Sequence, residues 1–174
     1  VAIGDSALYN CVVTGNMGNT AIGSKSLFAN TTGFSNTAIG FRTGYSNITG
    51  VDNSFYGFRS GYDNTIGDYN SFFGYQSGAS NKSGNNNSFF GNATGLKNIS
   101  GNFNSFFGDG CGWNNVTGNF NTAQGADAMY QNTSGSNNVS IGRNALYSNT
   151  IGLSNVAVGV GAIYSNDIGN RNTA

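Results

Sequence analysis

The pattern of polar and apolar residues along this chain repeats with a constant period. Asparagine stands at Asn19 and at every seventeenth residue after it, up to Asn172. We number the unit from this asparagine as phase 0. Phases 1–3 hold Thr or Ser and then two apolar or aromatic residues in most units, and glycine follows at phase 4. A second asparagine at phase 11 and a second glycine at phase 14 also recur through nine units.

These constant columns predict structural roles. Stacked identical amides can hydrogen-bond along an axis as an asparagine ladder. We expect such a ladder, rather than a ligand site, from Asn30, Asn36, Asn47, Asn53, Asn64, Asn70, Asn81, Asn87, Asn98 and Asn104. Two glycines per unit indicate turns with positive φ. The expected turn glycines are Gly40, Gly57, Gly74, Gly91 and Gly108 at phase 4 and Gly50, Gly67, Gly84 and Gly101 at phase 14.

The chain divides into repeat units, and neither the composition nor the residue pattern changes in a way that would mark a domain boundary. An irregular first unit covers residues 1–18, because Gly4 and Gly23 lie further apart than later phase 4 glycines and two extra residues fall around Cys11–Gly18. Nine regular units cover 19–171, and a partial unit covers 172–174. Neither end looks like the polar cap that solenoids use for solubility. We therefore expect one repeat array over residues 1–174, either as a slice of a longer fibre or as a unit that stacks end to end.

The unit is too short for a helical repeat, and Gly and Asn are poor helix formers. Phases 1–3 favour a short strand, and the small and aromatic residues at phases 6–10 favour a second strand. Each unit would then be one coil of a parallel β-solenoid, stacked about 4.8 Å above the last. The predicted fold is an all-β roll of about ten coils.

Side-chain volumes at phases 2 and 8 vary in opposite directions. Phe55, Phe72, Phe89 and Phe106 at phase 2 each share a unit with glycine at phase 8, whereas a small phase 2 residue accompanies a large phase 8 residue. Because a close-packed core conserves volume, the two phases should touch inside one coil. The unit with Ala38 and Gly44 breaks this rule.

Adjacent strand residues point to opposite faces, so phase 3 should point outward if phase 2 fills the coil. An exposed apolar stripe of this size is unusual on a monomer, and we expect other copies to cover it. The expected subunit interface is Ile22, Ile39, Tyr56, Phe73, Phe90, Phe107, Gln124, Ile141 and Val158.

Composition removes several classes of function. Seven basic and seven acidic residues give zero net charge, which argues against nucleic-acid binding. There is no histidine, and no apolar stretch is long enough to span a bilayer. We expect no catalytic residue, cofactor or metal site, and we read Asp52 and Asp68 as turn acids rather than a glycosidase pair. Cys11 and Cys111 lie about six coils apart, too far for a disulfide.

Two further columns are candidates for contact with other molecules. Aromatic residues at phase 9 either bind a glycan or host-surface partner, or pack between coils or between chains: Tyr45, Tyr62, Trp113, Tyr130, Tyr147 and Tyr164. Phase 11 contains six glycosylation sequons, at Asn30, Asn47, Asn81, Asn98, Asn115 and Asn132. Asparagine persists at Asn64, Asn149 and Asn166, where the sequon is broken, so a ladder also explains this column.

The motif Asn19-Thr20-Ala21-Ile22-Gly23, repeated at 36–40, resembles the head repeats of YadA-like trimeric autotransporter adhesins. It is similar also to Asn-Thr-Ala-Ile-Gly arrays of bacterial surface proteins and phage tail fibres. The resemblance covers essentially the whole chain and implies a parallel β-roll, trimerisation and an extracellular adhesive or fibre role. The longer period and the Phe-Phe central units depart from YadA-like heads.

The repeat predicts a non-catalytic, self-associating fibre segment. The resemblance implies that this segment lies outside the cell, forms a homotrimer and can attach to a host surface or glycan. The first alternative is a phage tail-fibre or tailspike segment. The second is an ice-binding solenoid, since Ser/Thr columns run at phases 1 and 13, although Val139, Val156, Ile66, Ile151 and Ile168 interrupt them.

Overall fold

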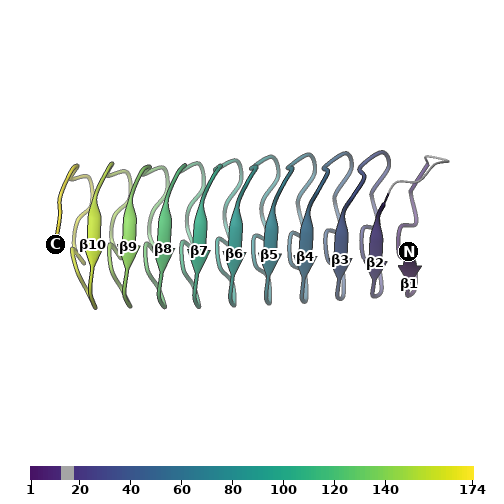
Figure 1. The fold of residues 1–174 in the computed structure, drawn as a ribbon, viewed down its shortest axis with the longest axis horizontal. Coiled ribbons are helices and arrows are strands. Elements are labelled where there is room, and N and C mark those ends of the chain that lie inside the picture. Colours follow the sequence, from purple (N-terminus) through teal and green to yellow (C-terminus); the bar gives the residue numbers. More distant parts are fainter. Residues whose placement is uncertain (13–17) are drawn as a thin grey trace.

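The computed structural model describes residues 1–12 and 18–174 of the chain. Within them, ten short strands lie side by side in one sheet in chain order, one strand for each coil (Figure 1). The strands are β1 (Ala2–Ile3), β2 (Thr20–Ile22), β3 (Thr37–Ile39), β4 (Ser54–Tyr56), β5 (Ser71–Phe73), β6 (Ser88–Phe90), β7 (Ser105–Phe107), β8 (Thr122–Gln124), β9 (Val139–Ile141) and β10 (Val156–Val158). The sequence places the two extra residues of the first unit around Cys11–Gly18, and residues 13–17 of this segment lie outside the described residues.

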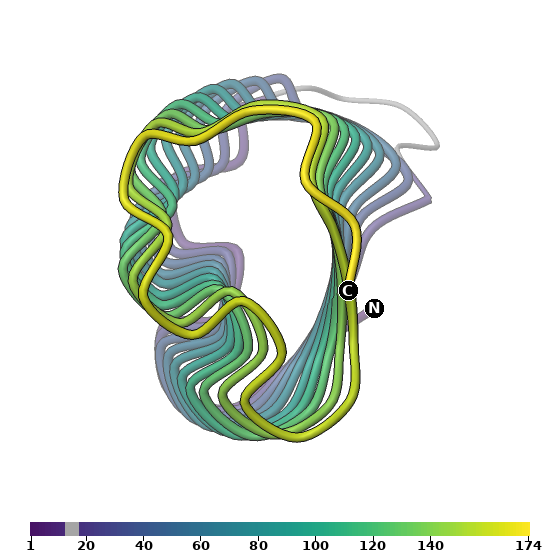
Figure 2. The same ribbon diagram turned by 90° about the vertical axis from the view of Figure 1, so that its left-hand side faces the viewer.

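Every strand pairs in parallel with the next at equivalent phases, as Ala38 with Phe55 and Ile39 with Tyr56 do between β3 and β4. Viewed along the stack, the coils nearly superimpose and rotate gradually from one end to the other (Figure 2). No helix occurs in residues 1–12 or 18–174. The predicted all-β parallel solenoid with one coil per repeat unit is therefore confirmed.

The second strand expected at phases 6–10 is wrong. This segment is a succession of turns, because residues at phases 6 and 8 adopt left-handed backbone conformations, as Lys25 (φ 58°) and Leu27 (φ 48°) do. An extended strand requires negative φ throughout. The turns still stack, because Leu27 N–H donates to the Thr43 carbonyl (3.0 Å) and Ala29 N–H donates to that of Tyr45 (2.9 Å).

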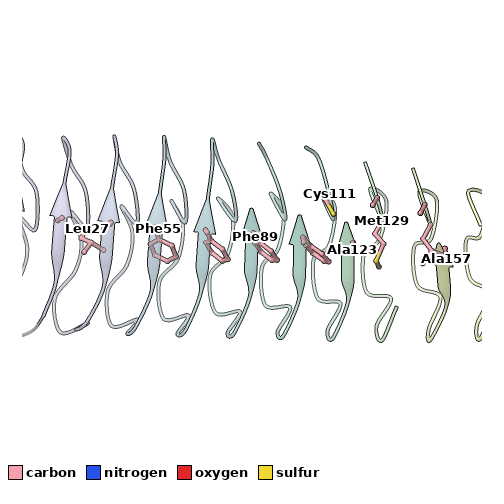
Figure 3. Packing of buried hydrophobic residues seen from close by; sticks show 14 residues of the cluster. Leu27, Phe55, Phe89, Cys111, Ala123, Met129 and Ala157 are labelled. Atoms are coloured by element: carbon pink, nitrogen blue, oxygen red, sulfur yellow. The ribbon is translucent and has the colours of Figure 1, made fainter. Parts of the chain in front are cut away.

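The core lies along the axis of the coil, where phase 2 side chains from the sheet meet the phase 8 wall (Figure 3). A Cβ atom on Gly78 would lie 2.5 Å from the ring of Phe72, so the predicted exchange of volume is confirmed. The exception is also explained. A Cβ on Gly44 would lie 2.9 Å from Phe55 of the following coil and 3.0 Å from Leu27 of the preceding one. Neighbouring coils thus fill the space that Ala38 leaves.

Both cysteines are free, as predicted. Cys111 is fully buried in the core and acts as a small packing residue. Burial raises the pKa of its thiol to about 12, because the thiolate would have no water around it.

Candidate functional site

Two asparagine ladders run through the interior, and they meet at one carbonyl in each coil from residue 19 to residue 171. Asn53 Nδ2 donates to Asn36 Oδ1 (3.0 Å) and to the Gly67 carbonyl (2.8 Å). From the other ladder, Asn64 Nδ2 donates to Asn47 Oδ1 (2.8 Å) and to the same Gly67 carbonyl (3.0 Å). The predicted ladder is confirmed, and its amides are fully buried from Asn30 to Asn155. These side chains use their hydrogen-bonding groups on one another and on the glycine carbonyls, and they are buried, so they are not available to a ligand.

The burial of phase 11 also corrects one expectation. The six sequon asparagines predicted as glycosylation candidates have no exposed surface, and each donates Nδ2 hydrogen bonds inside the coil. Glycosylation requires an accessible amide nitrogen. The folded coil therefore presents no acceptor at Asn30, Asn47, Asn81, Asn98, Asn115 or Asn132.

The two glycine columns serve different needs. Phase 4 glycines have positive φ as predicted, for example 138° at Gly40. The same prediction is wrong for phase 14, where Gly50, Gly67, Gly84 and Gly101 do not adopt positive φ. Only glycine fits at these positions, because neighbouring atoms leave no space for a side chain. A Cβ on Gly101 would collide with Asn98 Oδ1 and lie 2.5 Å from the Gly118 carbonyl.

The outer face of the sheet carries the phase 3 stripe, which points away from the core as expected. Rings of Tyr56, Phe73, Phe90 and Phe107 stack along it with centroid spacings of 4.5, 4.7 and 5.1 Å. Residues from Ile22 to Phe90 are half-buried, whereas those from Phe107 to Val158 are exposed. No strand of this sheet contains a charged residue. The stripe is therefore a long, uncharged, largely apolar surface.

The phase 9 aromatics form two stacks rather than one row. Tyr9, Phe28, Tyr45 and Tyr62 stack at 5.1–5.3 Å, and Trp113, Tyr130, Tyr147 and Tyr164 stack at 5.0–5.7 Å. Ala79 and Leu96 occupy the two coils between them. The rings pack on one another between coils, while their outer edges stay accessible.

Two stacked rows were not predicted from the sequence, and each occupies one phase of a few successive units. One is the aromatic row Phe41, Phe58 and Tyr75 at phase 5, with spacings of 5.5 and 5.2 Å. The other is an outer polar row at phase 15, in which Asp68, Asn85 and Asn102 accept backbone N–H bonds from the preceding coil. The Asp68 carboxylate is engaged there by Val51 N–H at 2.8 Å, as a turn acid would be.

Comparisons with protein-family models, with curated proteins and with solved structures found no match to this chain. Within residues 1–12 and 18–174, no group of three or more His, Cys, Asp or Glu side chains could hold a metal ion. No helix in this same part of the chain is long and apolar enough to cross a membrane.

Proposed function

We propose that this chain is a structural, adhesive segment of an extracellular fibre, on a cell surface or a virion, and that its copies associate laterally through the phase 3 stripe. The observation that carries the proposal is the uncharged outer face of the sheet. Each large apolar side chain buried there would contribute roughly 1.5–3 kcal/mol. Such a surface, continued over ten strands, favours association over exposure to water.

The occupant that best fits this face is a second copy of the same chain. Its side chains recur once per coil, so another copy with the same rise aligns every row at once, whereas an unrelated partner matches only a few. Three copies around one axis is the arrangement that the resemblance to YadA-like heads implies. Gln124, exposed in a single chain, would then bond to its symmetry copies or to water.

Sedimentation velocity at micromolar concentration tests the proposal. The wild-type chain should sediment as a trimer, and Phe90→Asp should shift it to a smaller species, because a carboxylate in an apolar interface is poorly solvated. Phe120→Asp is the matched control, since Phe120 is 56% exposed and lies outside the sheet. Far-UV circular dichroism verifies that both variants remain folded. A wild-type monomer, or equal effects of the two substitutions, would contradict the proposed interface.

A further inference from the structure

The break in the phase 9 aromatic row leaves one face of Tyr62 and one face of Trp113 without an aromatic neighbour. Tyr62 stacks on Tyr45 at 5.2 Å, and the next residue in the row is Ala79. The backbone continues without interruption, because Asp63 N–H donates to the Ala79 carbonyl (2.8 Å) and Ser80 N–H donates to that of Leu96 (3.0 Å). Only the ring is missing, so the second face of Tyr62 borders a position in the stack that holds no aromatic ring.

A groove of about 390 Å³ lies at this position, which we call the ring-gap groove. Its lining comes from three successive coils: Arg59, Tyr62, Asp63, Gln76, Ala79, Ser80, Leu96 and Lys97. Ala79 and Leu96 supply an apolar surface beside the Tyr62 ring, and five hydrogen-bonding side chains surround it. Ligand sites commonly combine apolar walls with a few convergent polar groups, and this volume suits a small ligand.

The charges around the groove favour an anion. The Arg59 guanidinium carbon lies 5.3 Å from the ring centroids of both Phe58 and Tyr62, and its Nε is buried without a hydrogen-bond partner. A planar guanidinium positioned by aromatic rings matches the geometry of a carboxylate. Lys97 adds a second cation, against one carboxylate at Asp63. Burial raises the pKa of Asp63, and Lys82 opposes this shift.

We propose that the ring-gap groove binds a carboxylated sugar ring. The pyranose takes the place of the missing aromatic ring on Tyr62, and its carboxylate pairs with Arg59 and Lys97. Asp63, Gln76 and Ser80 are placed to bond its hydroxyl groups. A purely aromatic ligand would stack equally well, but it would strip water from these polar groups without replacing their hydrogen bonds.

The groove lies on the wall of the coil opposite the sheet, because Gly78, next to Ala79, faces the Phe72 ring across the core. It therefore stays open when other copies cover the phase 3 stripe. The groove would supply the ligand class for the adhesive role proposed above, and its assignment rests on that role. Sedimentation tests the interface and sugar binding tests the groove, so either can fail alone.

Saturation-transfer NMR with methyl glucuronide and methyl glucoside tests the groove, because the two sugars differ only at C6, which is a carboxylate in the first and a hydroxymethyl group in the second. We expect the wild-type chain to bind the glucuronide in the millimolar range and the glucoside about tenfold more weakly. Ala79→Tyr extends the aromatic stack by one ring, fills the groove and should reduce glucuronide binding at least about tenfold. Arg59→Gln should remove the preference for the charged sugar.

Phe120→Ala is the matched control, since it removes an exposed stacked ring that does not line the groove and should leave binding unchanged. Circular dichroism establishes that each variant folds, and Arg59→Gln decides the matter if Ala79→Tyr does not fold. Absence of glucuronide binding overturns the proposal. Equal binding of both sugars overturns the role of the carboxylate, and an unchanged affinity in a folded Ala79→Tyr variant overturns the placement.

Discussion

The core is filled in two ways: some coils have phenylalanine at phase 2 and glycine at phase 8, and others have a small phase 2 residue and a large phase 8 residue. Two substitutions should move the boundary between these two kinds of coil by one coil. Phe106 and Gly112 share the last coil with a phenylalanine core, and Ala123 and Met129 share the next. A Cβ on Gly112 would overlap the Phe106 ring. Phe106→Ala together with Gly112→Met converts this coil to the composition of its neighbour. The double variant should therefore be far more stable than the two single variants imply.

The magnitudes follow from the packing. Phe106→Ala opens a cavity and should cost about 3 kcal/mol. Gly112→Met should also cost about 3 kcal/mol, about 2 from overpacking and about 1 from a side chain at φ +61°. Independent effects would total about 6 kcal/mol. In the double variant the clash and cavity cancel, and about 3 kcal/mol remains, because the 5.1 Å stack with Phe89 is lost and the fit is imperfect.

Urea unfolding of the four proteins closes a double-mutant cycle, with a coupling energy of about 3 kcal/mol expected. Far-UV circular dichroism reports on the whole array, and the single tryptophan, Trp113, reports on the altered coil. Phe106→Ala combined with Gly161→Met is the control, since Gly161 has φ +67° and no atom within 4 Å of its Cβ position. That pair should be additive. An additive result for Phe106 and Gly112 would refute their contact across the core.

Three further predictions follow from the interior. Asn87→Ala should destabilise the array by about 3 kcal/mol in urea unfolding, because its buried ladder partners lose their hydrogen bonds. Asn92 is exposed, so Asn92→Ala should cost less than about 1 kcal/mol. Equal effects of the two substitutions would contradict a structural ladder. Gly101→Ala should prevent stable packing of its coil, whereas Gly161→Ala should cost about 1 kcal/mol, as thermal melts of the two variants can compare. The Cys111 thiol has a pKa of about 12 in the folded chain against an ordinary 9.0, so above pH 9 only the unfolded state loses this proton. Stability should then fall by about 4 kcal/mol between pH 9 and 12, and Cys111→Ala should remove that part of the pH dependence; superimposable curves would contradict it.

Much of the architecture can be derived from the sequence, because the repeat has a constant length. Residues at equal phases can stack only if every coil closes after the same number of residues, and parallel in-register pairing then follows. The Asn36 and Asn47 columns predict ladders for the same reason. The opposite variation of Phe89 and Gly95 predicts their contact, since a filled core conserves volume.

Backbone conformation within the coil was decided by tertiary structure. Local preference favours a strand around Leu27, yet closing a coil this short demands left-handed residues there, and stacking hydrogen bonds compensate. Gly67 has the pattern of a turn residue in the sequence, but it is glycine because two ladder amides converge on its carbonyl and the next coil packs directly on it.

The candidate site shows the same division. The phase 9 column containing Tyr62 is visible in the sequence, and Ala79 is visible as a break in it. That break becomes a groove only because the folded coils hold neighbouring rings about 5 Å apart and bring Arg59 and Lys97 to its edge. A one-dimensional pattern records which residues share a phase. Which phases face one another, and which space between them stays open, depends on how the coil closes in three dimensions.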